Sequence, residues 1–379
     1  MSGVVERFDL SIPQAQLDDL RERLARTRWP EAETVDDWSQ GVPIRAMRAL
    51  VDYWRDGYDW RRCEAMLNGW GQSRAEIDGL GIHFLHIRSP EPDALPMIMT
   101  HGWPGSVIEF NKVIGPLTDP VAHGGEARDA FHLVVPSLPG YGFSDKPAKT
   151  GWTVERTGRA WIELMQLLGY GERWAAEGGD WGAAVTAAIG QARPPGLTGI
   201  HLNVAFLRPP VEDGNFTDEE QKILADMKHY TDWLSGYAVE QSTRPQTIGY
   251  SLVDSPVGQA SWIYEKFYDW TDHQGSPETV LTMDEMLDNI MLYWLSESGA
   301  SSARMYWESL VRLPHGIVDV PAGISIFPRE MFRASRRWTE KFYPQLVHFG
   351  VAEKGGHFAA FEQPGIFVDE VRKTFATLR

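Results

Sequence analysis

Apolar and polar residues repeat along the chain with two periods, one typical of helices and one of short buried strands. Residues 11–25 begin with Ser-Ile-Pro and place Leu17, Leu20 and Leu24 at helical spacing, and a second helix is expected from Ile44 to Trp54. Further on, short β-rich runs bounded by Gly and Pro alternate with helical stretches. The predicted strands are 82–87, 96–100, 131–135, 172–176, 199–203, 323–327 and 347–351. This alternation predicts an α/β fold with a mostly parallel sheet covered by helices on both faces.

One long interval interrupts this alternation. Residues 207–315 are aromatic-rich and have the pattern of helices inserted between two strands, which is typical of a lid. The expected division is a helical N-terminal extension (1–92) wrapping core and lid, a core (93–206 and 316–379) and a helical lid (207–315).

Composition and charge exclude several partners. The chain has 379 residues, 43% of them hydrophobic, and 36 basic against 52 acidic residues give a formal charge of −16. This charge argues against nucleic acid and anionic membranes as partners. A single cysteine, Cys63, excludes an intramolecular disulfide and fits a reducing compartment. Because the N-terminus lacks an apolar signal stretch and no apolar run approaches ~20 residues, a cytoplasmic protein is expected, with a homodimer left open.

The most informative segment is Gly178-Gly179-Asp180-Trp181-Gly182, between a predicted strand and a small-residue helix. Small-x-nucleophile-x-small sequences form a sharp turn that holds the middle side chain out over a sheet. A carboxylate there needs no general base to become a nucleophile, since it is ionised at neutral pH. An ordinary Gly-Asp turn remains the alternative.

Two further loops follow predicted strands. His101-Gly102-Trp103-Pro104 could present the Trp103 amide to an oxyanion, together with the amide of Trp181, although an ordinary turn is the alternative. Gly355-Gly356-His357 offers a histidine as a base.

A carboxylate that orients His357 could come from several places. We favour Glu330, which follows the predicted strand ending at Phe327, over Glu212 and Asp213. Asp319 precedes its strand and therefore lies at the opposite end of the sheet from the other candidates. The order nucleophile, acid, histidine is typical of α/β-hydrolases. No Gly-x-Ser-x-Gly occurs, which disfavours a serine esterase, and the commonest metal and nucleotide motifs are absent.

In combination, these segments resemble the microsomal-type epoxide hydrolases of the α/β-hydrolase superfamily. The resemblance covers nearly the whole chain, including the helical N-terminal segment. Its motifs stand in family order: His101-Gly102-Trp103-Pro104-Gly105-Ser106, Pro139-Gly140-Tyr141-Gly142-Phe143-Ser144, Gly178-Gly179-Asp180-Trp181-Gly182, Asp254-Ser255-Pro256-Val257-Gly258 and Gly355-Gly356-His357-Phe358-Ala359-Ala360. Animal members carry a membrane anchor before the extension, and this chain is expected to resemble soluble microbial members.

The resemblance implies roles that the residues alone do not fix. Asp180 would be the nucleophile, His357 the base and Glu330 the acid, with an epoxide and water as substrates and no metal or organic cofactor. It also singles out Tyr237 and Tyr306 as lid tyrosines that bind the epoxide oxygen. The lid interval offers seven candidates: Tyr230, Tyr237, Tyr250, Tyr264, Tyr268, Tyr293 and Tyr306.

Two other functions are weighed against this one. A haloalkane or haloacetate dehalogenase also uses an elbow aspartate followed by tryptophan, and Trp103 and Trp181 could bind halide. A non-catalytic receptor on a hydrolase scaffold need not keep a complete triad, whereas here every catalytic position is filled.

Overall fold

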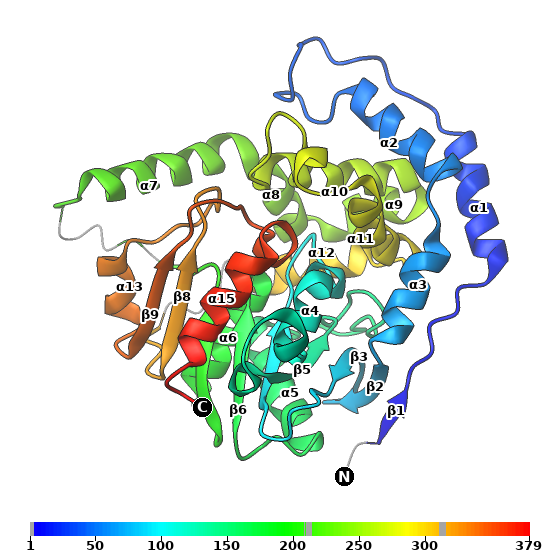
Figure 1. Ribbon diagram of the computed structural model, residues 1–379. Helices are drawn as coiled ribbons and strands as arrows, with labels where there is room; N and C mark the ends of the chain where they lie inside the picture. Colours follow the sequence, from blue (N-terminus) through cyan, green and yellow to red (C-terminus); the bar gives the residue numbers. More distant parts are fainter. Residues whose placement is uncertain (1–3, 208, 210–213, 311–315) are drawn as a thin grey trace.

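A nine-stranded sheet forms the centre of the molecule (Figure 1). A computed structural model describes residues 4–207, 209, 214–310 and 316–379. The strand order is β1-β2-β3-β5-β4-β6-β7-β8-β9. The strands are β1 Val5–Arg7, β2 Gln72–Ile77, β3 Leu80–Ile87, β4 Leu95–Thr100, β5 Phe131–Pro136, β6 Trp174–Gly178, β7 Leu197–Leu202, β8 Ala322–Ile326 and β9 Leu346–Val351. Strands β4 to β9 pair in parallel, so their carboxyl ends meet along one edge.

All seven predicted strands are present, with ends shifted by a few residues. Strands β1 and β2 were not predicted; β2 pairs antiparallel with β3, and β1 pairs antiparallel with β2. β1 is short and exposed, and β2 has the sequence QSRAEI without an apolar run. Since β1 to β3 lie within 1–92, the segment assigned to the N-terminal extension also contributes strands to the central sheet. The division into extension, core and lid otherwise stays a prediction.

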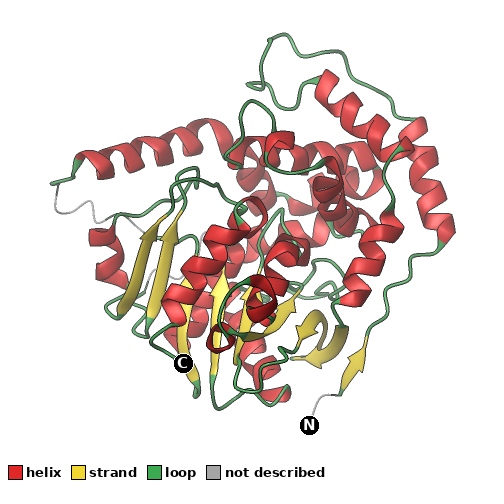
Figure 2. Ribbon diagram, viewed as in Figure 1, coloured by secondary structure: helices red, strands yellow, loops and turns green. Residues whose placement is uncertain are grey.

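Helices cover both faces of the sheet, as Figure 2 shows. Helices α5 and α6 pack together on one face, and α4 packs with α15 on the other. Alanine and glycine let α6 approach the sheet closely, and ten of its twelve residues are buried. The core helices are α4 Asn111–Thr118, α5 Val154–Leu167, α6 Trp181–Ala192, α13 Arg336–Phe342, α14 Ala359–Glu362 and α15 Pro364–Phe375.

A helical cap lies over the edge where the parallel strands end (Figure 1). It comprises α7 Asp218–His229, a π-helical turn Tyr230–Leu234, α8 Gly236–Thr243, α9 Pro245–Asp254, α10 Pro256–Trp270, α11 Met283–Leu295 and α12 Gly299–Ser309. Thr217 and Thr282 start α7 and α11 with capping boxes. These helices lie between β7 and β8, within the interval expected to form a lid.

The N-terminal helices pack on the cap. They are α1 Gln14–Ala25, α2 Ile44–Asp56 and α3 Trp60–Gly69, and they contact α10 and α11. The leucines of α1 are buried, as their spacing predicts. Tyr58 and Arg62 both donate hydrogen bonds to the buried carboxylate of Asp288 in α11, each at 2.7 Å. Among the helices that the structure describes, none has the length and apolarity needed to cross a membrane.

Candidate active site

Asp180 lies at a strained turn between β6 and α6. Its φ of 49° and ψ of −129° are rare for a residue with a side chain. The turn needs glycine on both sides: a Cβ on Gly178 would lie 2.3 Å from the Gly182 carbonyl oxygen, and one on Gly182 would lie 1.8 Å from the Thr100 carbonyl oxygen. The segment therefore has the elbow geometry that its sequence predicts.

A histidine and a second carboxylate face Asp180. His357 Nδ1 is 2.8 Å from Glu330 Oε2, and His357 Nε2 is 3.5 Å from Asp180 Oδ2. The structure thus brings together the three residues that we expected to form a triad. Asp319 instead pairs with Arg193 at 2.6 Å, and Glu212 and Asp213 lie outside the described residues.

The charges of this triad depend on one another. Burial lowers the pKa of His357, but the carboxylates of Glu330 and Asp180 outweigh burial and raise this pKa well above its ordinary value. The imidazole is therefore a cation between two carboxylates when Asp180 is ionised. Any reaction that neutralises Asp180 removes one source of this shift and lowers the pKa of His357.

The loop 101–106, which we call the oxyanion loop after its expected role, is joined to both Asp180 and the cap. The Trp103 amide donates a hydrogen bond to Asp180 Oδ1 at 2.8 Å. Asn289 of α11 donates to the Pro104 carbonyl at 2.8 Å and accepts from Ser106 Oγ at 2.7 Å. Trp181 is the first residue of α6, where helix amides lack partners within the helix.

Tyr237 and Tyr306 come from the cap, and both rings pack against Trp103. The Tyr237 ring stacks on Trp103 at 4.9 Å, and the Tyr306 ring meets Trp181 edge-on at 4.8 Å. The two tyrosine rings are 5.8 Å apart, and their side chains are buried. Burial raises the pKa of both hydroxyls well above 10, so both are proton donors at neutral pH.

The other five tyrosines of the lid interval have different partners. The Tyr230 hydroxyl is 2.8 Å from the Tyr237 hydroxyl, and no sequence signal distinguished it from the rest. The remaining four have separate surroundings: Tyr250 is exposed, Tyr264 donates to Glu278, Tyr268 stacks on Trp38 of the N-terminal segment, and Tyr293 donates to the Gly105 carbonyl after β4. Only tertiary packing separates these from the pair at the elbow.

Similarity to known proteins agrees with this geometry. The family model described as "Epoxide hydrolase N terminus" matches residues 5–110, and the α/β-hydrolase fold model matches residues 96–252. A protein of Stigmatella aurantiaca that bears the name "Putative epoxide hydrolase" is 56% identical over 98% of this chain and 85% of its own. Epoxide hydrolase 1 of Sus scrofa is 34% identical over 99% of this chain and 89% of its own. The chain belongs to the epoxide hydrolase family.

Solved structures of this family have the same fold. Aspergillus niger epoxide hydrolase is 32% identical, with a TM-score of 0.89 over 99% of this chain and 97% of that chain. Juvenile hormone epoxide hydrolase from Bombyx mori is 29% identical, with a TM-score of 0.90 over 99% and 95% of the two chains. The chain is therefore an α/β-hydrolase of the microsomal type, and these relatives favour epoxide hydrolysis over dehalogenation.

Two acidic side chains near the elbow of this epoxide hydrolase were not anticipated. Glu177, three residues before Asp180, is fully buried, and neither carboxyl oxygen has a hydrogen-bond partner among the described residues. Burial raises its pKa well above the ordinary value, with a contribution from Glu109. Burial also raises the pKa of Glu109 to about 8. Glu177 interrupts an apolar strand, and this was the one available sequence signal.

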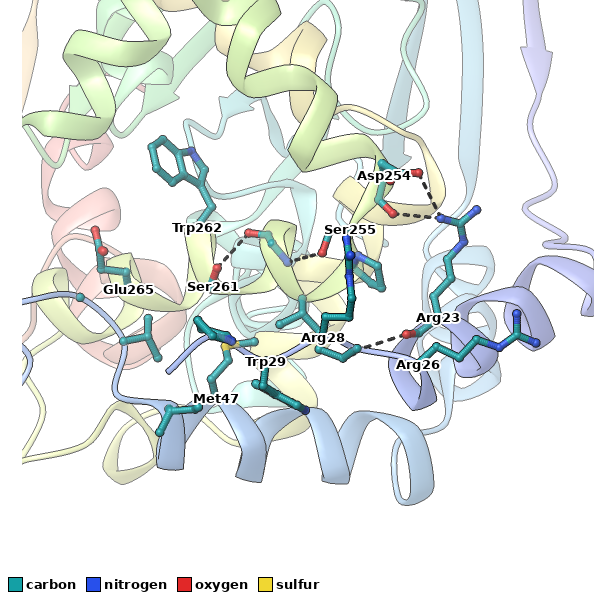
Figure 3. Close-up of a pocket in the computed structure, with 18 of the residues that line it drawn as sticks. Arg23, Arg26, Arg28, Trp29, Met47, Asp254, Ser255, Ser261, Trp262 and Glu265 are labelled. Atoms are coloured by element: carbon teal, nitrogen blue, oxygen red, sulfur yellow. Dashed lines mark hydrogen bonds and ion pairs between the residues drawn. The ribbon is translucent and has the colours of Figure 1, made fainter. Parts of the chain in front are cut away.

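A separate groove lies between the N-terminal segment and the cap (Figure 3). It has a volume of about 1010 Å³ and is lined by Arg23, Arg26, Trp29, Asp254, Trp262 and Glu265, among others. None of the triad residues or lid tyrosines lines it. Among the described residues, no cluster of three or more His, Cys, Asp or Glu could hold a metal ion.

Proposed function

We propose that this epoxide hydrolase opens an epoxide to a vicinal diol through an ester formed on Asp180. The observation that carries the proposal is the position of Asp180 between two sets of groups. His357 and the Trp103 amide contact its two carboxylate oxygens, and the rings of Tyr237 and Tyr306 both pack against the Trp103 ring. A nucleophile, a base, an oxyanion donor and an acid are all needed for this reaction.

In the first step, Asp180 attacks a ring carbon and the carbon–oxygen bond of the epoxide breaks. The Trp103 amide holds Oδ1, which leaves Oδ2 as the attacking atom. Tyr237 and Tyr306 donate hydrogen bonds to the leaving oxygen and supply its proton, because an alkoxide is a poor leaving group at neutral pH.

In the second step, water hydrolyses the ester. Epoxide opening leaves one tyrosine without its proton. Esterification removes the negative charge of Asp180, and this lowers the pKa of His357, so that the imidazolium releases its proton to restore the tyrosine hydroxyl and the neutral imidazole can then act as a base. His357 takes a proton from water while Glu330 stabilises the imidazolium. The tetrahedral oxyanion forms on the atom already held by the Trp103 amide, with the Trp181 amide as its second donor.

The test is a variant that separates the steps. His357→Gln should react with epoxide once and stall, because alkylation needs no base whereas general-base help is typically worth ~10²–10⁴-fold in ester hydrolysis. Intact mass spectrometry should show one substrate mass per chain, and peptide mapping should place it on Asp180.

His348→Gln is a matched control. His348 also pairs with a glutamate, Glu370 at 2.7 Å, but lies on β9 away from Asp180. This variant should turn over without an adduct. Unmodified His357→Gln protein after long incubation with a bound epoxide would rule out the covalent route.

One observation favours dehalogenation as a second candidate. The indole Nε1 of Trp181 is buried and has no hydrogen-bond partner among the described residues, so it could donate to a halide. A coupled assay for halide release from haloalkanes and haloacetates, run beside a panel of aryl and alkyl epoxides, distinguishes the two reactions.

A further inference from the structure

A buried lysine lies against the ring of Tyr237. Lys266 belongs to α10 and is 2% exposed. Its Nζ is 4.6 Å from the centroid of the Tyr237 ring and 5.7 Å from that of Trp270. A cation at such a distance is attracted to an aromatic face, more strongly where water is excluded. The two-step reaction described above uses no lysine.

Acidic neighbours keep this ammonium inside the protein. Lys266 Nζ forms an ion pair with Glu265 and lies 4.0 Å from Asp269. Both acids are more exposed than the lysine, and Glu265 lines the groove between cap and N-terminal segment (Figure 3). A buried charge is costly even when it is paired. The ammonium therefore contacts carboxylates that reach solvent and a ring that does not.

The position of the ammonium matters when the epoxide opens. A bond forms between Asp180 Oδ2 and the ring carbon as the carbon–oxygen bond of the epoxide breaks. The electron pair of the broken bond moves to the epoxide oxygen. As that oxygen takes the proton of Tyr237, negative charge develops on the phenol oxygen and spreads into its ring. A cation beside the ring stabilises this charge and makes the hydroxyl a stronger donor. In the described part of the chain, no cation lies over the ring of Tyr306.

We propose that Lys266 is a positioning residue for epoxide opening that acts through Tyr237, holding its ring and strengthening its hydroxyl as the donor to the epoxide oxygen. Lys266 transfers no proton in this role. The proposal rests on the roles given above to Asp180 and Tyr237. It also makes the two tyrosines unequal, with Tyr237 the stronger acid.

The experiment measures alkylation directly. All variants carry His357→Gln, so that the ester accumulates and its rate of formation is followed by intact mass. Lys266→Met should slow adduct formation by roughly 5–30-fold. This is the change in rate expected if the transition state loses stabilisation equal to that of one buried cation–π contact. In a protein that also carries Tyr237→Phe, Lys266→Met should change the rate of adduct formation by less than about twofold, because no hydroxyl remains to be strengthened. Beside Tyr306→Phe it should keep its full effect.

Two controls separate this role from simple packing. Lys266→Arg keeps a cation near the ring and should restore the rate to within about threefold. Lys112→Met removes a lysine of the same kind, 5.1 Å from the Phe361 ring and 2.7 Å from Glu285, and should leave the rate unchanged. Lys266→Gln replaces Lys266→Met if circular dichroism shows that the latter does not fold.

Different outcomes contradict the role of Lys266 and the proposed roles of Asp180 and Tyr237. Equal slowing with and without the Tyr237 hydroxyl, or no slowing at all, overturns the role of Lys266. Absence of an Asp180 adduct in the His357→Gln parent, or an undiminished rate with Tyr237→Phe, instead overturns the proposed function.

Discussion

The loops of the core and the helices of the cap hold their functional groups in different ways. Asp180, Glu330 and His357 lie on loops at the end of the sheet and are fixed by polar contacts of 2.8 to 3.5 Å. Tyr237 and Tyr306 lie on helices, and ring packing against the tryptophans fixes them. The core thus fixes charges at short range, whereas the cap fixes the orientation of neutral donors.

This contrast assigns one half-reaction mainly to each region. In the proposed reaction, ester hydrolysis needs His357, Glu330 and the Trp103 amide, all of which lie outside the cap. Epoxide opening needs Asp180 as well, but its acid comes from the cap. The regions meet where Asn289 of α11 binds the oxyanion loop. Variants in the core should therefore block either the formation or the hydrolysis of the ester. Variants in the cap should slow only its formation.

The largest effect is expected in the core, from Asp180→Asn. A neutral amide is a far weaker nucleophile, and both half-reactions pass through this side chain. Diol formation should fall by at least about 10⁴-fold, and no adduct should form in the His357→Gln background. Steady-state assays and intact mass measure both quantities. Immediate full turnover by the variant, with the substitution confirmed by mass, would show that Asp180 is not the nucleophile.

The next effect is expected in the cap. Tyr237→Phe and Tyr306→Phe should each slow adduct formation by about 10–100-fold, since each removes one of two donors to the same oxygen. The rate of ester hydrolysis, read in single-turnover decay of the adduct, should stay nearly unchanged. Tyr250→Phe, at an exposed tyrosine of the same cap, is the control. If hydrolysis slows as much as alkylation, the division between core and cap is wrong.

The same contrast explains what the sequence could predict. Asp180 and its loop could be placed because a strained turn needs glycine at fixed neighbouring positions, which leaves a local pattern. Glu330 was one of several carboxylates, since only the distance to His357 selects it. The cap tyrosines came from family resemblance, because ring packing leaves no spacing rule. Lys266 and Glu177 were missed altogether, because the burial of a charged side chain is a property of the tertiary fold.

A smaller effect, on stability, is expected from Glu109, which lies in the short 3₁₀ helix Val107–Phe110. Burial raises its pKa to about 8 in the folded protein, against ~4.3 for a free glutamate. Between these values the folded chain holds a proton that the unfolded chain has released. Stability should therefore fall as pH rises, by at most ~1.4 kcal/mol per pH unit. Glu109→Gln should flatten this slope.

Denaturation at several pH values from about 5 to 8 measures the slope. Glu126→Gln, at an exposed glutamate of the core, should keep the parent slope. A Glu109→Gln variant with the parent slope would show that Glu109 is ionised in the folded protein and that water reaches its carboxylate.

The smallest effect concerns how the cap is held rather than what it does. Asp288 is buried in α11 and accepts hydrogen bonds from Tyr58 and Arg62 of the N-terminal segment. Asp288→Asn keeps the shape but removes the charge opposite the half-exposed Arg62, so the free energy of unfolding should fall by about 1–3 kcal/mol.

Asp284→Asn is the matched change on the same helix. Asp284 accepts from Tyr53 and lies 3.7 Å from Arg62, but it is more exposed, so its loss should cost less than about 1 kcal/mol. Neither change touches the site, and folded protein should form the ester at the parent rate to within about twofold. If Asp288→Asn instead slows ester formation as much as Tyr237→Phe while the protein stays folded, the N-terminal segment sets the position of the tyrosines. The cap would then depend on the N-terminal helices as closely as the triad depends on its own loops.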